Sequence, residues 1–269
     1  MVKRLLKHEI SYYLRTLIPV YIILLSFSVL GRVIQLFETD SVVYNIVFGS
    51  SVFIFVVALI VSTFMATVLA IVRFYRNLFT GEGYLTFTLP ITSTQHIIVK
   101  LLGAFISHIL TTLVMIASVG IITAGDVLTE IVKALGYALG IAHDAIGTHL
   151  IFYIIEVVVV LLIASIHNTL LYFTFISIGQ LFRKNRILAA FGAYFAFTVA
   201  TQIIMTVLTS LFTVFYDYLP IPEIVSIMEA HPYASVHIVI CAFGLFCAIF
   251  ALVYFLITRY IITRKLNLE

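Results

Sequence analysis

The chain has 269 residues, of which 63% are hydrophobic and only 10% are charged. A soluble domain of this length carries roughly a quarter charged residues, so the composition excludes a water-soluble globular protein. The net charge of +3 forms no basic stripe on a water-exposed face, which argues against a nucleic-acid partner. Six continuous apolar runs, each long enough to cover about 30 Å of hydrocarbon, predict an all-α polytopic membrane protein with six transmembrane helices in a single domain (1–269).

The predicted elements begin with an amphipathic interfacial helix over residues 1–15, whose basic face would lie against anionic lipid. Transmembrane spans are predicted at 16–36, 43–72, 97–124, 150–182, 187–216 and 236–257. Thr92 and Gln95 have the capping-box spacing, so we expect the third span to start at Thr92. The link 125–149 has an apolar side typical of a surface helix, which Gly136, Gly140 and Gly147 should interrupt.

The charges divide between the two sides of the membrane when the links are assigned alternately. Of the 15 basic residues, all but Arg32 and Lys133 fall on the side that holds both termini, the loop 73–96 and the link at Arg183. Basic residues near span ends stay in the cytoplasm. We therefore expect both termini and the loop 73–96 to be cytoplasmic and the links 125–149 and 217–235 to be extracellular.

The loop 73–96 is a polar island between two spans. A loop that transmits force to a partner needs a short rigid helix and an exposed charged and aromatic face. Phe74 together with Arg73, Tyr75, Arg76 and Phe79 would provide that face, and Gly81 and Gly83 would permit the return turn. The alternative is a solvated loop whose arginines only enforce topology. The candidate contact residues are Arg73, Tyr75, Arg76, Phe79, Glu82, Gly83, Tyr84 and Pro90.

The six spans, the N-terminal amphipathic helix and this loop together resemble the membrane subunit of an ATP-binding-cassette (ABC) exporter of the G-type class. In that family the loop carries an acidic residue and a glycine, then an apolar stretch that ends in Leu-Pro and a small hydroxyl residue. Glu82-Gly83-Tyr84 and Leu89-Pro90-Ile91-Thr92 fit this outline. The match in motif covers residues 73–96, whereas the match in architecture covers the whole chain.

The resemblance implies a multi-pass permease subunit that exports an amphiphilic substrate such as a lipid, drug or peptide. The membrane is expected to be a cell membrane, namely a bacterial plasma membrane. The resemblance also implies ABC ATPase subunits docked on the loop 73–96 and a second permease subunit, either a copy or a relative. No Gly-x-x-x-x-Gly-Lys-Ser/Thr motif occurs in the sequence. We therefore expect no cofactor, metal or catalytic residue in this chain, with ATP and Mg on the partner ATPase.

Five polar residues lie within predicted spans, where ionisable groups usually face a bundle interior or a cavity. They are Arg32, His108, Glu156, His167 and Gln202. Glu156, His167 and Thr174 lie on one helical stripe, which would line a transport pathway or a proton route. Alternatively, Glu156 pairs with Arg32 and the histidines bond to neighbouring helices, which is the simpler way to satisfy buried charges.

Two other functional classes stay open. An intramembrane enzyme would use Glu156 and His167, and an ion-coupled transporter or a membrane scaffold would need no ATPase. Secondary transporters commonly have repeats and broken spans, whereas these spans are mostly unbroken. The external histidines His143, His149, His231 and His237 match no standard metal-ligand spacing and are expected to be ordinary polar residues.

Overall fold

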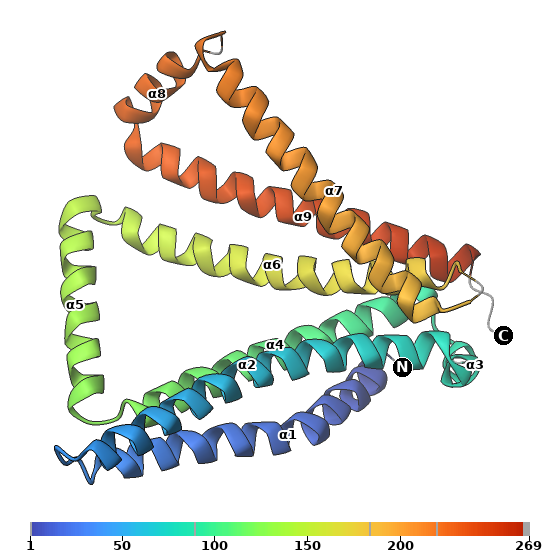
Figure 1. The fold of residues 1–269 in the computed structure, drawn as a ribbon. Coiled ribbons are helices and arrows are strands. Elements are labelled where there is room, and N and C mark those ends of the chain that lie inside the picture. Colours follow the sequence, from blue (N-terminus) through green and yellow to red (C-terminus); the bar gives the residue numbers. More distant parts are fainter. Residues whose placement is uncertain (1, 89, 183, 219, 266–269) are drawn as a thin grey trace. The chain divides into compact units, whose positions relative to one another are not determined.

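The computed structural model describes residues 2–88, 90–182, 184–218 and 220–265, and every regular element in these ranges is a helix. Six of the helices are long and apolar enough to cross a membrane (Figure 1). They are α1 (Val2–Gln35), α2 (Val42–Phe79), α4 (Ser93–Ile122), α6 (His149–Gly179), α7 (Arg186–Val214) and α9 (Pro232–Arg264). The prediction of an all-α membrane protein with six spans is confirmed.

The chain divides into two compact units, residues 1–142 and 143–269. In the first unit α1 lies along both α2 and α4. Tyr21 of α1 bonds to Thr111 of α4 (Oη–Oγ1, 2.7 Å), and both residues come about half-way along their helices. Gly103 permits this close approach, because a Cβ atom there would lie 3.1 Å from the ring of Tyr13.

The residues paired between helices give the direction of each helix within a unit. In the first unit Glu9 pairs with Lys100 and Tyr21 with Thr111, so α1 and α4 run parallel. Lys100 of α4 bonds to Asn77 near the end of α2, while Met115 further along α4 lies beside Thr63, which precedes Asn77 in α2. The helix α2 is therefore antiparallel to both, as successive membrane crossings require.

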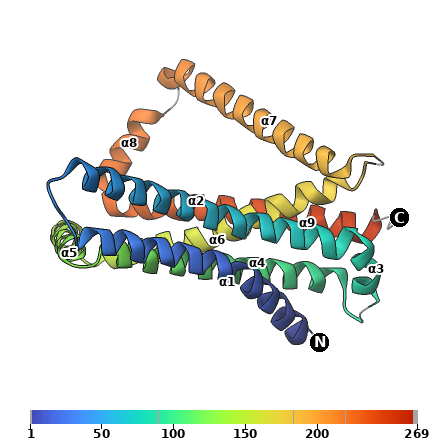
Figure 2. The ribbon, with the colours of Figure 1, turned by 60° about the horizontal axis from the view of Figure 1, so that its bottom comes forward.

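The helix α1 begins well before the first predicted span. Residues 2–15 are continuous with the span in one helix, and their basic residues Lys3, Arg4 and Lys7 are exposed. Pro19 inside the helix cannot donate the usual backbone hydrogen bond, which favours a change of direction. Figure 2 shows that the N-terminal part of α1 is inclined to the rest of the helix.

The link after α4 forms α5 (Asp126–Ile146). The expected interruptions at Gly136 and Gly140 are wrong, because both glycines lie inside this continuous helix. Glycine lowers helix propensity by only about 1 kcal/mol, which a 21-residue helix tolerates. Gly147, with φ of +59°, does follow the end of α5, as expected of a residue that adopts the left-handed conformation easily.

The second unit is built on the pair α6 and α9 (Figure 1). His167 Nδ1 lies 3.2 Å from the Cys247 carbonyl, and Thr174 donates to the Tyr254 carbonyl (3.1 Å). The contacts advance together along both helices, so α6 and α9 run parallel. Between them in sequence come α7, which packs on α6, a short 3-10 turn, and α8 (Ile221–Ala230), which packs on α9.

Candidate functional site

The loop predicted at residues 73–96 is largely helical. The helix α2 continues to Phe79, so Arg73, Tyr75, Arg76 and Phe79 lie on its last two turns. The extended residue Thr80 (φ −113°, ψ −172°) then separates α2 from α3 (Gly81–Phe87). Neither Gly81 nor Gly83 has a positive φ, so the turn does not use glycine freedom as expected. The expected rigid short helix is present as α3, which carries Glu82, Gly83 and Tyr84.

The exposed face of this region differs from the predicted one. Phe74 and Phe79 are buried and their rings pack together, because they point from α2 into the unit. Tyr84 is 52% exposed and Leu85 is 74% exposed on α3. Arg76 and Glu82 form an exposed ion pair (Nη2–Oε1, 3.3 Å).

Other parts of the motif flank this face. Pro90 is exposed after α3, and Tyr75 on α2 is half-buried. The capping box at Thr92 and Gln95 is confirmed and starts α4 at Ser93. Leu89 of the Leu-Pro motif lies outside the described residues, as does Arg183 of the predicted basic link.

A buried polar network lies beneath this face. Arg73 of α2 donates to both carboxylate oxygens of Glu9 on α1, at 3.3 Å from each, and stacks 3.9 Å above the ring of Tyr12. Lys100 of α4 donates to Glu9 Oε1 and to the side-chain oxygen of Asn77 on α2. These five side chains therefore join α1, α2 and α4.

The network continues into α3. The Asn77 amide donates to Glu82 Oε2 (2.5 Å), so the short helix is bonded to α2 and, through Lys100, to α4 and α1. Glu9 and Lys100 are 4% and 5% exposed, and charges that deep are stable only when they are paired and hydrogen-bonded. The network thus holds α3 through Glu82, while Tyr84 and Leu85 of α3 stay exposed.

Sequence reasoning missed Glu9, Asn77 and Lys100. Glu9 and Lys100 are 91 positions apart, so no local spacing reveals their pairing. The sequence signal that could have found Glu9 and Lys100 was an isolated charge in an unsuitable segment. Glu9 is an acid within a strongly basic segment, and Lys100 lies inside an apolar run, so each needs a partner of opposite charge.

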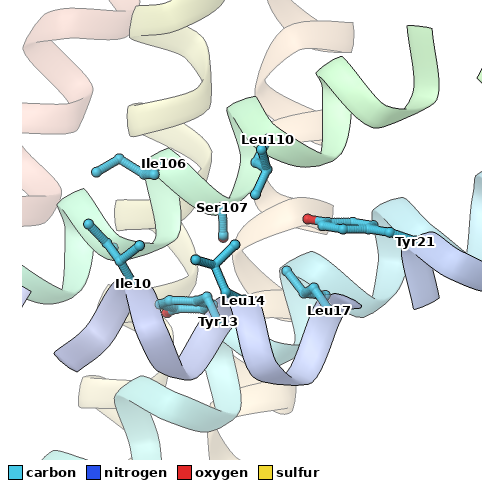
Figure 3. Close-up of a pocket in the computed structure, with 9 residues that line it drawn as sticks. Ile10, Tyr13, Leu14, Leu17, Tyr21, Ile106, Ser107 and Leu110 are labelled. Atoms are coloured by element: carbon cyan, nitrogen blue, oxygen red, sulfur yellow. The ribbon is translucent and has the colours of Figure 1, made fainter. Parts of the chain in front are cut away.

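A small cavity lies between α1 and α4 next to this network (Figure 3). Its volume of about 20 Å³ is close to that needed for a single water molecule. Its lining is mainly apolar, with Leu14 and Leu17 on one side and Ile106 and Leu110 on the other. This cavity is therefore too small for an amphiphilic substrate.

The predicted intramembrane residues are satisfied differently from the expected arrangement. Arg32 donates to Gln35 (3.0 Å), whereas Glu156 bonds to His237 (Oε1–Nδ1, 2.7 Å). Each of the two therefore has a partner within its own unit, and the pairing of Glu156 with Arg32, which would join the two units, stays a prediction. His108 Nε2 is buried without a hydrogen-bond partner among the described residues.

The stripe of Glu156, His167 and Thr174 on α6 is confirmed, since all three side chains face α9. Glu156 and His167 are not brought together, because eleven helical residues span about 16 Å. Each bonds instead to a different turn of α9. Gln202 is exposed on α7, on a side shared with four hydroxyl residues, Thr206, Thr209, Ser210 and Thr213.

His237 also lies 3.1 Å from His149 (Nε2–Nδ1), so two histidines that were predicted to be ordinary polar residues belong to one hydrogen-bonded chain with Glu156. Within the described ranges, no cluster of three histidine, cysteine or acidic residues could hold a metal ion. Comparison with family models, curated proteins and solved structures gave no match to this chain. Fold and composition together define a multi-pass helical membrane protein.

Proposed function

We propose that this chain is the membrane-spanning permease subunit of an ABC exporter, driven by separate ATPase subunits that dock on α3 from the cytoplasm. The observation that supports this most is the short helix between the second and third spans. It exposes Tyr84 and Leu85, and aromatic side chains are enriched at protein interfaces. The neighbouring ion pair of Arg76 and Glu82 gives the surface a polar rim.

The network beneath α3 supports a role in transmitting movement. A docked ATPase can move the spans only if the contacted helix does not simply bend away. Glu82 is tied through Asn77 to Lys100, and Lys100 is tied to Glu9. A displacement of α3 would therefore be shared among α1, α2 and α4, because breaking this buried network would leave charges unpaired.

The polar side of α7 supports a second permease subunit or a water-filled pathway. Gln202, Thr206 and Thr209 lie on one side of a helix on which Ala190 is the sole buried residue. Polar side chains in a span usually face a protein interior or a cavity. A second permease subunit, whether a copy or a relative, would cover this side. The cargo would be amphiphilic, and ATP and Mg would bind the ATPase.

The test is purification of the tagged chain from its native membrane in mild detergent. We expect an ATPase with a phosphate-binding loop to copurify in stoichiometric amount. The double variant Tyr84→Ala with Leu85→Ala should lose at least ten-fold of this ATPase, because truncating interface anchors typically costs more than 1 kcal/mol each.

The matched control is Phe37→Ala, which removes an aromatic ring that is more exposed than that of Tyr84 (72% against 52%) from the link after α1. Both variants should keep the expression level and thermal unfolding temperature of the natural chain. Copurification without any ATPase, or equal recovery of ATPase with the double variant and the control, would contradict the proposal.

A further inference from the structure

A hydrogen-bonded chain of three ionisable side chains lies at the N-terminal ends of α6 and α9. Glu156 Oε1 bonds to His237 Nδ1 at 2.7 Å, and His237 Nε2 bonds to His149 Nδ1 at 3.1 Å. Glu156 follows His149 by seven residues of α6, so the chain extends about 10 Å along the helix. None of these groups contributes to the network at α3.

The carboxylate of Glu156 determines which ring nitrogens carry hydrogen. An ionised carboxylate only accepts hydrogen bonds, so His237 Nδ1 must donate. Neutral His237 then has a free lone pair on Nε2, and His149 Nδ1 must donate to it. His149 Nε2 is consequently left as a hydrogen-bond acceptor at the end of the hydrogen-bonded series that is farthest from Glu156.

Two tyrosines fix this geometry. The ring of Tyr233 stacks on His149 with centroids 4.7 Å apart, and the ring of Tyr153 lies 4.4 Å from that of His237. Tyr153 donates to the Tyr233 carbonyl (3.0 Å), and Tyr233 donates to the Ala145 carbonyl (3.2 Å). The imidazoles are therefore held in line by groups whose own hydrogen bonds are made elsewhere.

We propose that Glu156, His237 and His149 form a proton-binding site. The site takes up one proton at His149 Nε2, and successive proton transfers carry the positive charge from His149 toward the carboxylate of Glu156. When a proton binds His149 Nε2, the Nδ1 proton of His149 moves to His237 Nε2. The His237 Nδ1 proton then either stays, giving an ion pair with Glu156, or moves to the carboxylate. The site changes from net charge −1 to zero in both cases.

The second carboxylate oxygen gives this uptake a physical reason. Glu156 Oε2 is buried and has no hydrogen-bond partner within the described part of the chain. A charged carboxylate with an unsatisfied oxygen inside a span is costly, and neutralising the site relieves that cost.

Among the described residues, the hydrogen bonds and ring contacts of this site reach two further ionisable side chains, both of them tyrosines. On α7, Arg186 lies beside the far end of α6 near Gly179, and Tyr194 packs on Tyr172 and Phe175. On α8, Glu223 and Glu229 are exposed. The titratable groups in contact with the chain of three are therefore Tyr153 and Tyr233.

The experiment is nitrogen-15 NMR of the full chain, labelled at its eight histidines and placed in phospholipid vesicles. His149→Gln and His237→Gln variants assign the two signals. At alkaline pH we expect both rings to carry hydrogen on Nδ1. On acidification the two rings should change together as one proton binds, and Glu156→Gln, which removes the negative charge of the site, should abolish this shared midpoint.

The matched control is His8→Gln, which removes an exposed histidine of α1 and should leave both signals unchanged. If Glu156→Gln fails to fold, the tautomers and the titration midpoints of the two rings in the natural chain still test the proposal. Hydrogen on Nε2 in either ring at alkaline pH, or separate midpoints for the two rings, would overturn the proposal. So would rings that stay neutral and keep hydrogen on Nδ1 at every pH at which the protein stays folded, which would leave only a packing role.

Discussion

The ion cluster around Glu9 shows how single residues decide which part of this chain is rigid. One carboxylate accepts from Arg73 and Lys100, which come from two different spans. Two cations around one buried acid would be unfavourable without further acceptors. Asn77 supplies one to Lys100, and the ring of Tyr12 supplies a π-face to Arg73.

Removing one partner of this cluster should destabilise the first unit. We expect Glu9→Gln to lower the free energy of unfolding by about 3–5 kcal/mol, because it leaves Lys100 as an uncompensated buried charge. Lys100→Met should cost less, because Arg73 still pairs with Glu9. The double variant should lose clearly less than the sum of the two. Unfolding by denaturing detergent, followed by far-UV circular dichroism, measures the three values.

Arg76→Met is the matched control for this cycle. Its ion pair with Glu82 has side chains that are 59% and 44% exposed, so solvent screening should limit the loss to at most about 1 kcal/mol. If the effects of Glu9→Gln and Lys100→Met simply add, the two side chains do not interact in the way described.

Sequence pattern alone predicts residues with local partners and fails for residues with distant ones. Thr92 and Gln95 were predictable because a capping box needs three residues of spacing and nothing else. The partner of Glu156 was not predictable, since His237 is 81 positions away and the choice among several polar residues depends on helix packing. The burial of Phe74 and Phe79 likewise depends on how α2 rotates against α1 and α4.

At the scale of elements, the length of the apolar runs is the sequence feature that predicts the six membrane-spanning helices. The six spans were correct because a hydrophobic run reports burial in lipid regardless of tertiary contacts. The ends of the helices were less accurate. The helices α2 and α9 continue several residues beyond their apolar runs, where Asn77 and Arg264 are polar but helical propensity persists.

The turn between α6 and α7 depends on one glycine. A Cβ atom on Gly179 would lie 2.5 Å from the backbone oxygen of Arg186 and 2.7 Å from Ala190 Cβ. The backbone at Arg186 cannot move aside for a methyl group as a flexible side chain could. We expect Gly179→Ala to lower the free energy of unfolding by about 1–3 kcal/mol, measured by the same detergent titration.

Gly192→Ala on α7 is the control for that variant. A Cβ atom there would meet no atom within 4 Å, so the change should be neutral or should stabilise the helix by up to about 1 kcal/mol. Equal effects of the two substitutions would mean that α6 and α7 do not approach each other closely at Gly179.

At the scale of the whole molecule, the charge distribution predicts which links share a side of the membrane. The parallel pairs α1 with α4 and α6 with α9 agree with alternate crossing within each unit. We expect cysteine at Thr39 to react with a membrane-impermeant maleimide from outside the cell. Cysteine at Lys184 should react only after the membrane is opened.

These cysteines are placed in a chain in which Cys241 and Cys247 are replaced by serine and alanine. Tyr84→Cys on α3 serves as the internal control, since it should behave like the cysteine at Lys184. Labelling of all three positions from the same side would contradict the six-span topology.

The long sequence separation between Glu9 and Lys100 has a consequence for synthesis. At about 5–20 residues per second, the ribosome adds Lys100 roughly 5–20 s after Glu9. During that interval the acid has no lysine partner, and α1 cannot adopt its final position. Its exposed basic residues Lys3, Arg4 and Lys7 would let the nascent segment rest among lipid headgroups until the third span arrives.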